Sequence, residues 1–260
     1  MKIDLTDAQW ERIRRHFPEE NIPSDRAGRK PIPTRHVLEA ALWILNTGAQ
    51  WHMLPQYYPN YKTVHRRFQE WCQQEVLRDV ITDLANELRE CGVIDEREAF
   101  IDATFAPARG GGEDIGPTKR GKGVKIMAIV DRHGLPLAAS IHAANHHEVT
   151  LVQLTFDFYM VEAKPEKLVG DKGYDSDPLD GEMKSQGVEL IAPHKENRKK
   201  LKTQDGRSLR RYQRRWMVER FFAWIGWNRR VLIRWEYYTR NFLGWIQLAC
   251  MRLLLRASRF

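Results

Sequence analysis

Hydrophobic residues recur at helical spacing through the first 92 residues of the chain. Thr6 precedes the first such segment as a candidate N-cap, and Trp10 begins its apolar face. The next segment has Thr34 in the N-cap position, and Gly48 is placed to end it. The pattern predicts an all-α region of four helices, the last three at about 34–47, 61–71 and 75–90.

Between about residues 97 and 193 the pattern changes to short β-prone runs separated by turns. Arg132-His133-Gly134 predicts a tight turn between two antiparallel strands. Helices are expected at 147–161, capped by Asn145, and at 178–186. Strands are expected at 99–104, 123–131, 135–142, 167–171 and 188–191. This order of strands and helices predicts an α/β region built on a central sheet.

The remaining segment, 194–260, is strongly basic and reads as a loop followed by long helices at 209–227 and 239–255. It holds 18 Lys and Arg against four Asp and Glu, whereas residues 1–193 hold 24 against 30. Such a concentration of positive charge indicates a polyanionic partner, most commonly nucleic acid. A disordered basic tail is the alternative, but this segment is rich in Trp and Phe, which such tails lack.

Composition excludes several other classes of protein. With 42% hydrophobic residues in a chain of 260, there is enough apolar material for a folded core. The longest apolar stretch is far too short for a membrane span, and the first residues lack the apolar run of a signal peptide. Three widely spaced cysteines form neither a disulfide framework nor a metal-binding pair. We expect a soluble protein of a reducing compartment.

A candidate DNA-reading module lies in the N-terminal region. The helix that starts near residue 61 carries basic residues in its first turns and follows another helix after an irregular connection. This order is compatible with a helix-turn-helix, in which the second helix presents its N-terminal turns to the major groove. A plain helical bundle with an arginine-rich surface explains the same pattern equally well.

Three acidic residues stand where catalytic carboxylates are common. Asp102 and Asp171 each follow a buried-looking strand, and Glu219 lies in an otherwise basic and aromatic helix. Tyr212 and Arg215 share one helical face with Glu219. Three carboxylates around one point bind hard divalent cations such as Mg²⁺, and two such ions promote phosphodiester chemistry.

Two other kinds of site find little support. His142 and His146 are four residues apart, but His142 ends a predicted strand, so the spacing is not that of a helical zinc site. The sequence has no Gly-x-x-x-x-Gly-Lys-Ser/Thr phosphate loop, so the use of ATP is not expected.

The three acidic segments, taken together, resemble the signature of DDE transposases of bacterial insertion sequences, most closely the insertion-sequence-five family. The segments are Ile101-Asp102-Ala103-Thr104, Gly170-Asp171-Lys172-Gly173-Tyr174-Asp175 and Tyr212-x-x-Arg215-x-x-x-Glu219-Arg220. The residues 5–10, 28–31 and 43–55 also resemble the N-terminal domain of that family. The likeness covers about residues 5–235.

The resemblance implies a fold, a reaction and a set of site residues. The α/β fold would be a ribonuclease-H-like catalytic core with a mixed sheet in residues 93–260, followed by C-terminal helices. An all-α, helix-turn-helix-like DNA-binding domain would occupy residues 1–92. Asp102, Asp171 and Glu219 would be the catalytic and metal-binding residues, holding two Mg²⁺ (or Mn²⁺) ions without ATP. Tyr212, Arg215 and Lys172 would support them.

The implied protein is a DNA transposase of the bacterial cytoplasm and nucleoid. It would bind the terminal inverted repeats as a homodimer, cleave at the element ends and join the 3′-hydroxyl to double-stranded target DNA. Relatives often have a basic residue seven positions after the glutamate, where this chain has Gly226, so we assign that role to Arg229 or Arg230. The other candidate contacts are Arg29, Lys30, Lys62, Arg66, Arg67, Lys195, Arg198, Arg210, Arg211 and Arg214. A metal-dependent nuclease and an inactive DNA-binding regulator remain the alternatives.

Overall fold

A computed structural model describes residues 3–23, 28, 30–196, 198–199 and 206–257. The N-terminal region consists of helices joined by short 3₁₀ turns, as the hydrophobic pattern predicts. Thr6 caps the first helix, and its side chain and that of Gln9 bond reciprocally to each other's backbone N–H. The four helices are α1 (Asp7–Ile13), α2 (Thr34–Thr47), α3 (Tyr61–Gln73) and α4 (Val76–Glu90).

The expected cap of α2 is wrong. Thr34 is the first residue of the helix rather than its N-cap, which is Pro33. The Thr34 side chain is buried, and its hydroxyl accepts a hydrogen bond from the Arg67 guanidinium at 3.0 Å. The hydroxyl is therefore used by a tertiary contact from α3 instead of the helix end. Gly48 ends α2 with φ of 69°, the left-handed conformation that glycine adopts without strain.

A mixed six-stranded sheet forms the centre of the molecule. Strand β1 runs antiparallel to β3, and β3 pairs antiparallel with β4 and with the short β2. On the other side, β1 is parallel to β5, and β5 is parallel to β6. The strands are β1 (Glu98–Pro107), β2 (Gly116–Thr118), β3 (Gly121–Val130), β4 (Pro136–Ala143), β5 (Lys167–Val169) and β6 (Glu189–Ile191).

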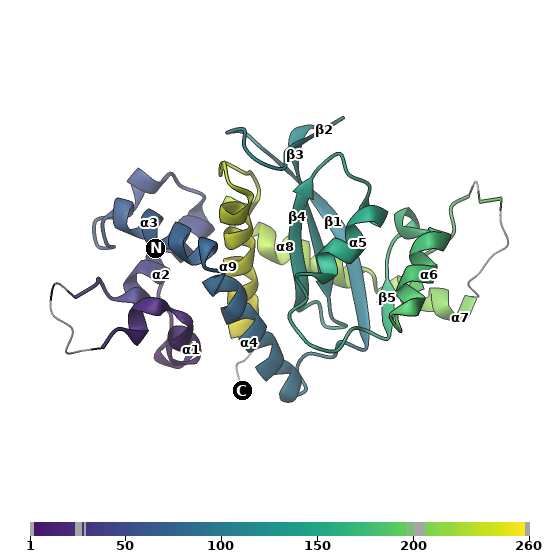
Figure 1. Ribbon diagram of the computed structural model, residues 1–260, viewed down its shortest axis with the longest axis horizontal. Coiled ribbons are helices and arrows are strands. Elements are labelled where there is room, and N and C mark those ends of the chain that lie inside the picture. The colour runs from purple at the N-terminus through teal and green to yellow at the C-terminus, as the bar shows by residue number, and fades with distance from the viewer. Residues whose placement is uncertain (1–2, 24–27, 29, 197, 200–205, 258–260) are drawn as a thin grey trace.

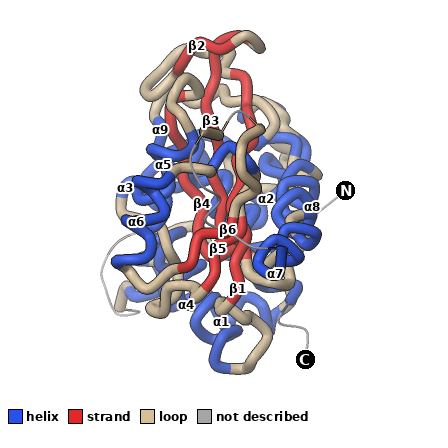
Figure 2. The backbone as a smooth tube through the Cα atoms, turned by 90° about the vertical axis from the view of Figure 1, so that its right-hand side faces the viewer, coloured by secondary structure: helices blue, strands red, loops and turns tan. Residues whose placement is uncertain are grey.

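Helices cover both faces of this sheet. Helices α5 (Glu148–Phe156) and α6 (Asp177–Ser185) lie on one face, and α8 (Trp216–Gly226) lies on the other (Figure 2). Consecutive residues of β3, from Ile126 to Val130, are buried as a result. Helix α5 is shorter than expected, and its N-cap is His147, not the predicted Asn145.

The C-terminal helix α9 (Thr239–Ala257) lies between the N-terminal helices and the sheet (Figure 1). It packs against α2, α3 and α4 on one side and against β4 on the other. The mixed α/β class, with N-terminal and C-terminal helices, is confirmed, while the domain boundary at residue 92 stays a prediction. In the described part of the chain, no helix is long and apolar enough to cross a membrane.

The long helix expected over residues 209–227 is not continuous. The segment consists of α7 (Gly206–Leu209), a 3₁₀ turn η5 (Arg210–Arg214) and then α8. The turn brings Arg211 and Arg214 to the carboxylate of Glu98 at the start of β1, at 3.1 and 2.6 Å. Glu98 lies 113 residues before Arg211 in the sequence. The helix is therefore interrupted where it meets a distant carboxylate, which helical periodicity does not predict.

Candidate functional site

The strand register brings Asp102 and Asp171 to neighbouring positions. In the parallel pair β1–β5, Phe100 is paired with Val169. Asp102 lies two residues beyond that pair within β1, and Asp171 lies two residues beyond it, just after β5 ends. The two carboxylates interact electrostatically, because the negative charge of Asp171 helps to raise the pKa of Asp102. Asp171 follows the end of β5 as expected, whereas the strand-end position expected for Asp102 is wrong, because β1 continues past it to Pro107.

The chain turns sharply at Asp171. Its carboxylate caps the 3₁₀ turn η4 (Lys172–Tyr174) by accepting a hydrogen bond from Gly173 N–H at 2.7 Å. The Tyr174 ring packs so closely on Gly170 that a Cβ there would lie 2.7 Å from it. Tyr174 is fully buried, and in the described residues its hydroxyl has no hydrogen-bond partner. Glycine at 170 therefore allows a large side chain to support the turn that presents Asp171.

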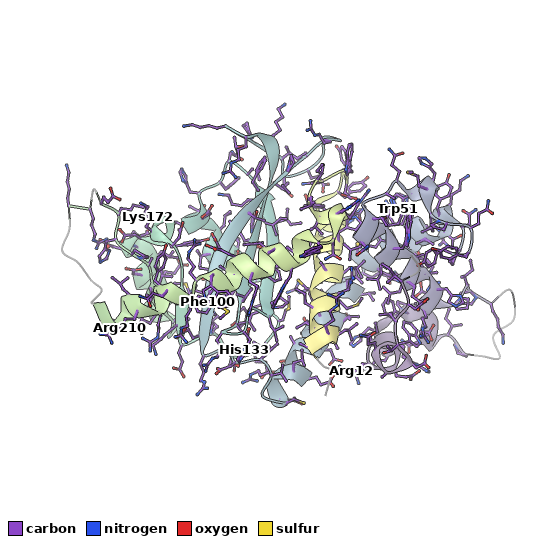
Figure 3. The ribbon with its side chains drawn as sticks, turned by 180° about the vertical axis from the view of Figure 1, so that it is seen from behind. Arg12, Trp51, Phe100, His133, Lys172 and Arg210 are labelled. Atoms are coloured by element: carbon purple, nitrogen blue, oxygen red, sulfur yellow. The ribbon has the colours of Figure 1, made fainter. Side chains whose placement is uncertain are left out.

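Glu219 is connected to these two acids through an arginine, and the three residues Asp102, Asp171 and Glu219 are called the acidic edge. Helix α8 crosses the strands on the face that Figure 3 turns toward the viewer, packing on β1 and β3. Arg215, at its N-terminal end, reaches Asp102 Oδ2 with Nη1 at 2.7 Å and Glu219 Oε1 with Nη2 at 2.5 Å. One guanidinium therefore bridges a carboxylate of the sheet and a carboxylate of the helix.

The electrostatic environment perturbs Asp102 most clearly. Burial raises the pKa of its carboxyl to about 6, because the charged form is poorly solvated there. The Ala103 backbone N–H and the Arg215 guanidinium counteract this effect, whereas Asp171 and Glu148 increase it. A carboxyl with a raised pKa, partly buried beside two other acids, is a physical sign of a functional site.

Glu148 lies near these acids, although it is not among the site residues predicted from the sequence. It is the first residue of α5, where its charge acts on Asp102 and Tyr174. Lys125 of β3 forms an ion pair with it at 3.1 Å. His142 bonds to the Ser140 hydroxyl at 2.8 Å. The signal in the sequence that could have identified Glu148 is its place as an acidic residue in the first turn of the helix after the β3–β4 hairpin.

The oxygen donors match the chemistry of a divalent cation, but they are not gathered around one point. Among the described residues, no three His, Cys, Asp or Glu side chains are close enough together to hold a metal ion. The positive charge that lies between Asp102 and Glu219 is the Arg215 guanidinium. The carboxylates thus fit a hard cation, provided that the guanidinium gives up one or both of its contacts.

The predicted supporting residues lie at the same edge. Arg215 stacks on the Tyr212 ring, with 5.8 Å between the guanidinium carbon and the ring centroid. Lys172 follows Asp171 directly and is exposed, with Glu196 at 3.5 Å. In Figure 3, Lys172 and Arg210 lie at the same end of the molecule, away from Trp51.

The candidate DNA contacts fall into three groups. Lys30, Lys62, Arg66, Arg210 and Arg229 are exposed. Arg211 and Arg214 are paired with Glu98, and Lys195 and Arg198 bond to Asp175. Arg67 and Arg230 are buried, contrary to the surface role expected of them. Arg29 lies outside the described residues.

Internal partners account for both buried arginines. Arg67 bonds to Glu19, to the Ile32 carbonyl and to the Thr34 hydroxyl. Arg230 pairs with Glu236 at 2.6 Å, with 8% of each side chain exposed. Neither guanidinium is presented to solvent, so neither is included among the DNA contacts proposed below.

Comparison with protein families and known proteins gives a consistent result. Residues 5–81 match the family described as "Putative transposase of IS4/5 family", and residues 94–254 match the family "Transposase DDE domain". The "Putative transposase for insertion sequence element IS402" of Burkholderia cepacia is 31% identical over 143 residues, which are 52% of this chain and 64% of the relative. The "Uncharacterized protein y4sN" of Sinorhizobium fredii is 31% identical over 124 residues, or 47% of this chain and 88% of the relative.

A solved structure supports the fold. The piggyBac transposase in a synaptic complex with hairpin DNA superposes with a TM-score of 0.54 at 10% identity, covering 98% of this chain and 73% of the other. This likeness shows a shared ribonuclease-H-like fold. The three catalytic candidates remain predictions, because neither the family matches nor the superposition assigns individual residues.

Proposed function

Because this chain belongs to the family of DDE transposases, we propose that it cleaves DNA at the ends of an insertion sequence and joins them to target DNA. The observation that carries the proposal is the acidic edge, where Asp102 of β1 lies near Asp171, which follows the parallel neighbouring strand β5. Glu219 is tied to the same edge by the Arg215 bridge. This is an arrangement suited to phosphodiester chemistry.

Asp102, Asp171 and Glu219 would hold two Mg²⁺ (or Mn²⁺) ions, without ATP. When bound, the ions supply Lewis-acid activation of the attacking hydroxyl and neutralise charge on the leaving oxygen. Arg215 must then release at least one carboxylate. The released guanidinium lies beside the reacting centre, where its fork of N–H groups suits the non-bridging oxygens of the scissile phosphate.

The reaction proceeds in two displacements. A water molecule attacks the phosphorus at the element end, the bond from phosphorus to the 3′-oxygen breaks, and that oxygen leaves with a proton as a free 3′-hydroxyl. The 3′-hydroxyl then attacks a phosphodiester of the target, forming a new bond to phosphorus and releasing a target 3′-hydroxyl. Each step exchanges one phosphorus–oxygen bond for another, so no energy source is needed.

The basic surface would hold the DNA. Lys30, Lys62, Arg66, Arg210 and Arg229 are the exposed candidates for contacts with the backbone, and Lys172 would lie near the scissile phosphate. Helix α3 has an Asn60 cap and places Lys62 in its first turn, the part of a recognition helix that contacts the major groove. We propose that the protein works as a homodimer on two inverted repeats, because two ends must be joined together. Its place of action would be the bacterial nucleoid.

The test uses purified protein and labelled DNA that carries the sequence flanking its own gene. Cleavage to a 3′-hydroxyl and joining to a second duplex are scored with Mg²⁺, with Mn²⁺ and with EDTA. Glu219→Gln should abolish both reactions while DNA binding persists. Glu182→Gln, an equivalent change at an exposed acid on α6, should leave both unchanged.

The outcomes separate the alternatives. Metal-dependent cutting without joining would contradict transposition and indicate a nuclease. Tight DNA binding without cutting under any metal would contradict enzymatic activity and indicate a regulator. Equal activity of Glu219→Gln and the parent protein would remove Glu219 from the proposed site.

A further inference from the structure

A basic pocket of about 510 Å³ lies apart from the acidic edge. Three elements form its walls: the C-terminal end of α2, the end of α8 with the turn that follows, and the second half of α9. Arg229, Arg252 and Arg256 line it together with Trp224 and Trp227. Trp227 is 81% exposed, which is unusual for the largest apolar side chain.

The charge of the pocket is not compensated. No acidic residue belongs to the described residues that line it. Arg252 is half-buried, and its guanidinium donates to the side-chain oxygens of Asn46 and Asn228. Burial and the neighbouring charge of Arg256 lower the pKa of Arg252, with no acid acting against them. Like charges held together without a counter-charge destabilise the fold unless an anion joins them.

The surrounding fold keeps these arginines in position. The turn η6 (Arg229–Val231) is anchored by the buried pair of Arg230 and Glu236, and Arg230 also reaches the Ala49 carbonyl. Gly48 at the end of α2 leaves room for the turn, because a Cβ there would lie 3.0 Å from Arg229 Cβ. Arg229 is exposed beside its buried neighbour. The pocket is therefore built by tertiary contacts rather than by chance proximity of side chains.

The position of the pocket relates it to the acidic edge. Glu219 and Trp227 are eight residues apart in and just beyond α8, which corresponds to about 12 Å along the helix axis at 1.5 Å per residue. Successive phosphates of one DNA strand advance by about 3.4 Å along the duplex axis, so this interval spans roughly three to four nucleotides. Arg220, which follows Glu219, stacks on Trp216 and on Trp224, with its guanidinium carbon 4.7 and 4.6 Å from the ring centroids.

We infer that the pocket formed by Arg229, Arg252, Arg256 and Trp227 binds backbone phosphates of a DNA strand, a few nucleotides from the phosphodiester at the acidic edge. The inference rests on the proposed function for the identity of the polymer. Guanidinium groups provide paired donors for phosphate oxygens, and the exposed indole provides an apolar surface for the adjoining sugar. Arg252 and Arg256 are added to the DNA contacts that the sequence predicted.

The test measures DNA affinity as a function of salt in EDTA, so that no cleavage is involved. Fluorescence anisotropy with a labelled duplex carrying the element end gives the slope of log K against log salt. Each phosphate contact contributes about 0.9 to that slope. Arg256→Gln and Arg229→Gln should each reduce the slope by about one and weaken binding roughly eightfold at 0.1 M salt. Arg256→Lys should retain the slope.

Control variants separate the pocket from a general effect of charge. Arg14→Gln makes the same change in net charge at an exposed arginine of the N-terminal region and should leave the slope unchanged. Trp227→Ala should weaken binding without changing the slope, because the indole is uncharged. Thermal unfolding of each variant confirms that it is folded. Equal slopes for Arg256→Gln, Arg229→Gln and Arg14→Gln would overturn the inference.

Inorganic phosphate is the alternative ligand for the pocket, because it offers the same oxygens as the DNA backbone. Stabilisation of the parent protein by inorganic phosphate, lost in Arg256→Gln while the DNA slope stays unchanged, would also overturn the inference. Failure of the proposed function is a distinct result: the protein would bind DNA with pocket-dependent slopes and yet neither cut nor join it with any metal.

Discussion

Replacing Arg215 with glutamine should raise the pKa of Asp102 further. In the parent protein burial raises that pKa to about 6, and Arg215, 2.7 Å away, opposes the shift. Two unit charges 4 Å apart interact by about 4 kcal/mol at an effective dielectric constant of 20, which corresponds to roughly three pKa units. About a fifth of each side chain is exposed, so solvent reduces this effect. We expect a rise of at least about one unit.

The assay is a pH titration of the Asp102 side-chain carboxyl carbon by NMR in metal-free protein. The midpoint should move from about 6 to about 7 or above in Arg215→Gln, and Arg215→Lys should recover part of the difference. Arg132→Gln removes a guanidinium that pairs with Asp95 instead, and it should leave the Asp102 midpoint unchanged. A midpoint at or below 6 in Arg215→Gln would refute the reasoning, because the guanidinium would then not stabilise the carboxylate.

Three further predictions concern the same region and its support. Burial raises the folded-state pKa of Asp102, so the stabilisation from its protonated carboxyl is complete below about pH 4 and falls by about 3 kcal/mol as the pH rises through 6. Asp102→Asn should remove this pH dependence of the unfolding free energy, measured by urea unfolding across pH. Glu148→Gln should lower the Asp102 midpoint in the same NMR titration, because a neighbouring negative charge is removed, and no shift would contradict that coupling. Glu236→Gln should cost about 3–5 kcal/mol in unfolding free energy, because it leaves the buried Arg230 unpaired, whereas Arg229→Gln at the exposed neighbour should cost under about 0.5 kcal/mol.

Part of the candidate site could be predicted from the sequence because its signals are local. Asp171 lies in a Gly-Asp-Lys-Gly turn and could be placed at a strand end, whereas Asp102 follows a hydrophobic run but lies inside β1, which extends further than the local pattern predicts. Glycine at 48 and threonine at 6 likewise marked helix ends that the structure confirms. Short-range patterns of this kind depend on neighbouring residues alone.

Long-range partners account for what the sequence could not predict. The break in the helix before α8 accompanies pairing of Arg211 and Arg214 with Glu98 in β1, far away in the chain. The burial of Arg67 depends on Glu19, which approaches only after the N-terminal helices pack. The sequence alone does not show whether an arginine is buried or exposed, because that depends on where its carboxylate partner lies. Which arginines are buried and which are exposed could therefore be seen only in the structure.

The central claim is that Glu219 acts with Asp102 and Asp171 in metal-dependent cutting and joining of DNA. The most direct measurement compares the parent protein with Glu219→Gln on labelled DNA from the end of the element, in Mg²⁺, Mn²⁺ and EDTA. The account predicts 3′-hydroxyl ends and joined products only with metal and only in the parent protein, with equal DNA binding by both. Cutting and joining by Glu219→Gln at the parent rate would contradict it.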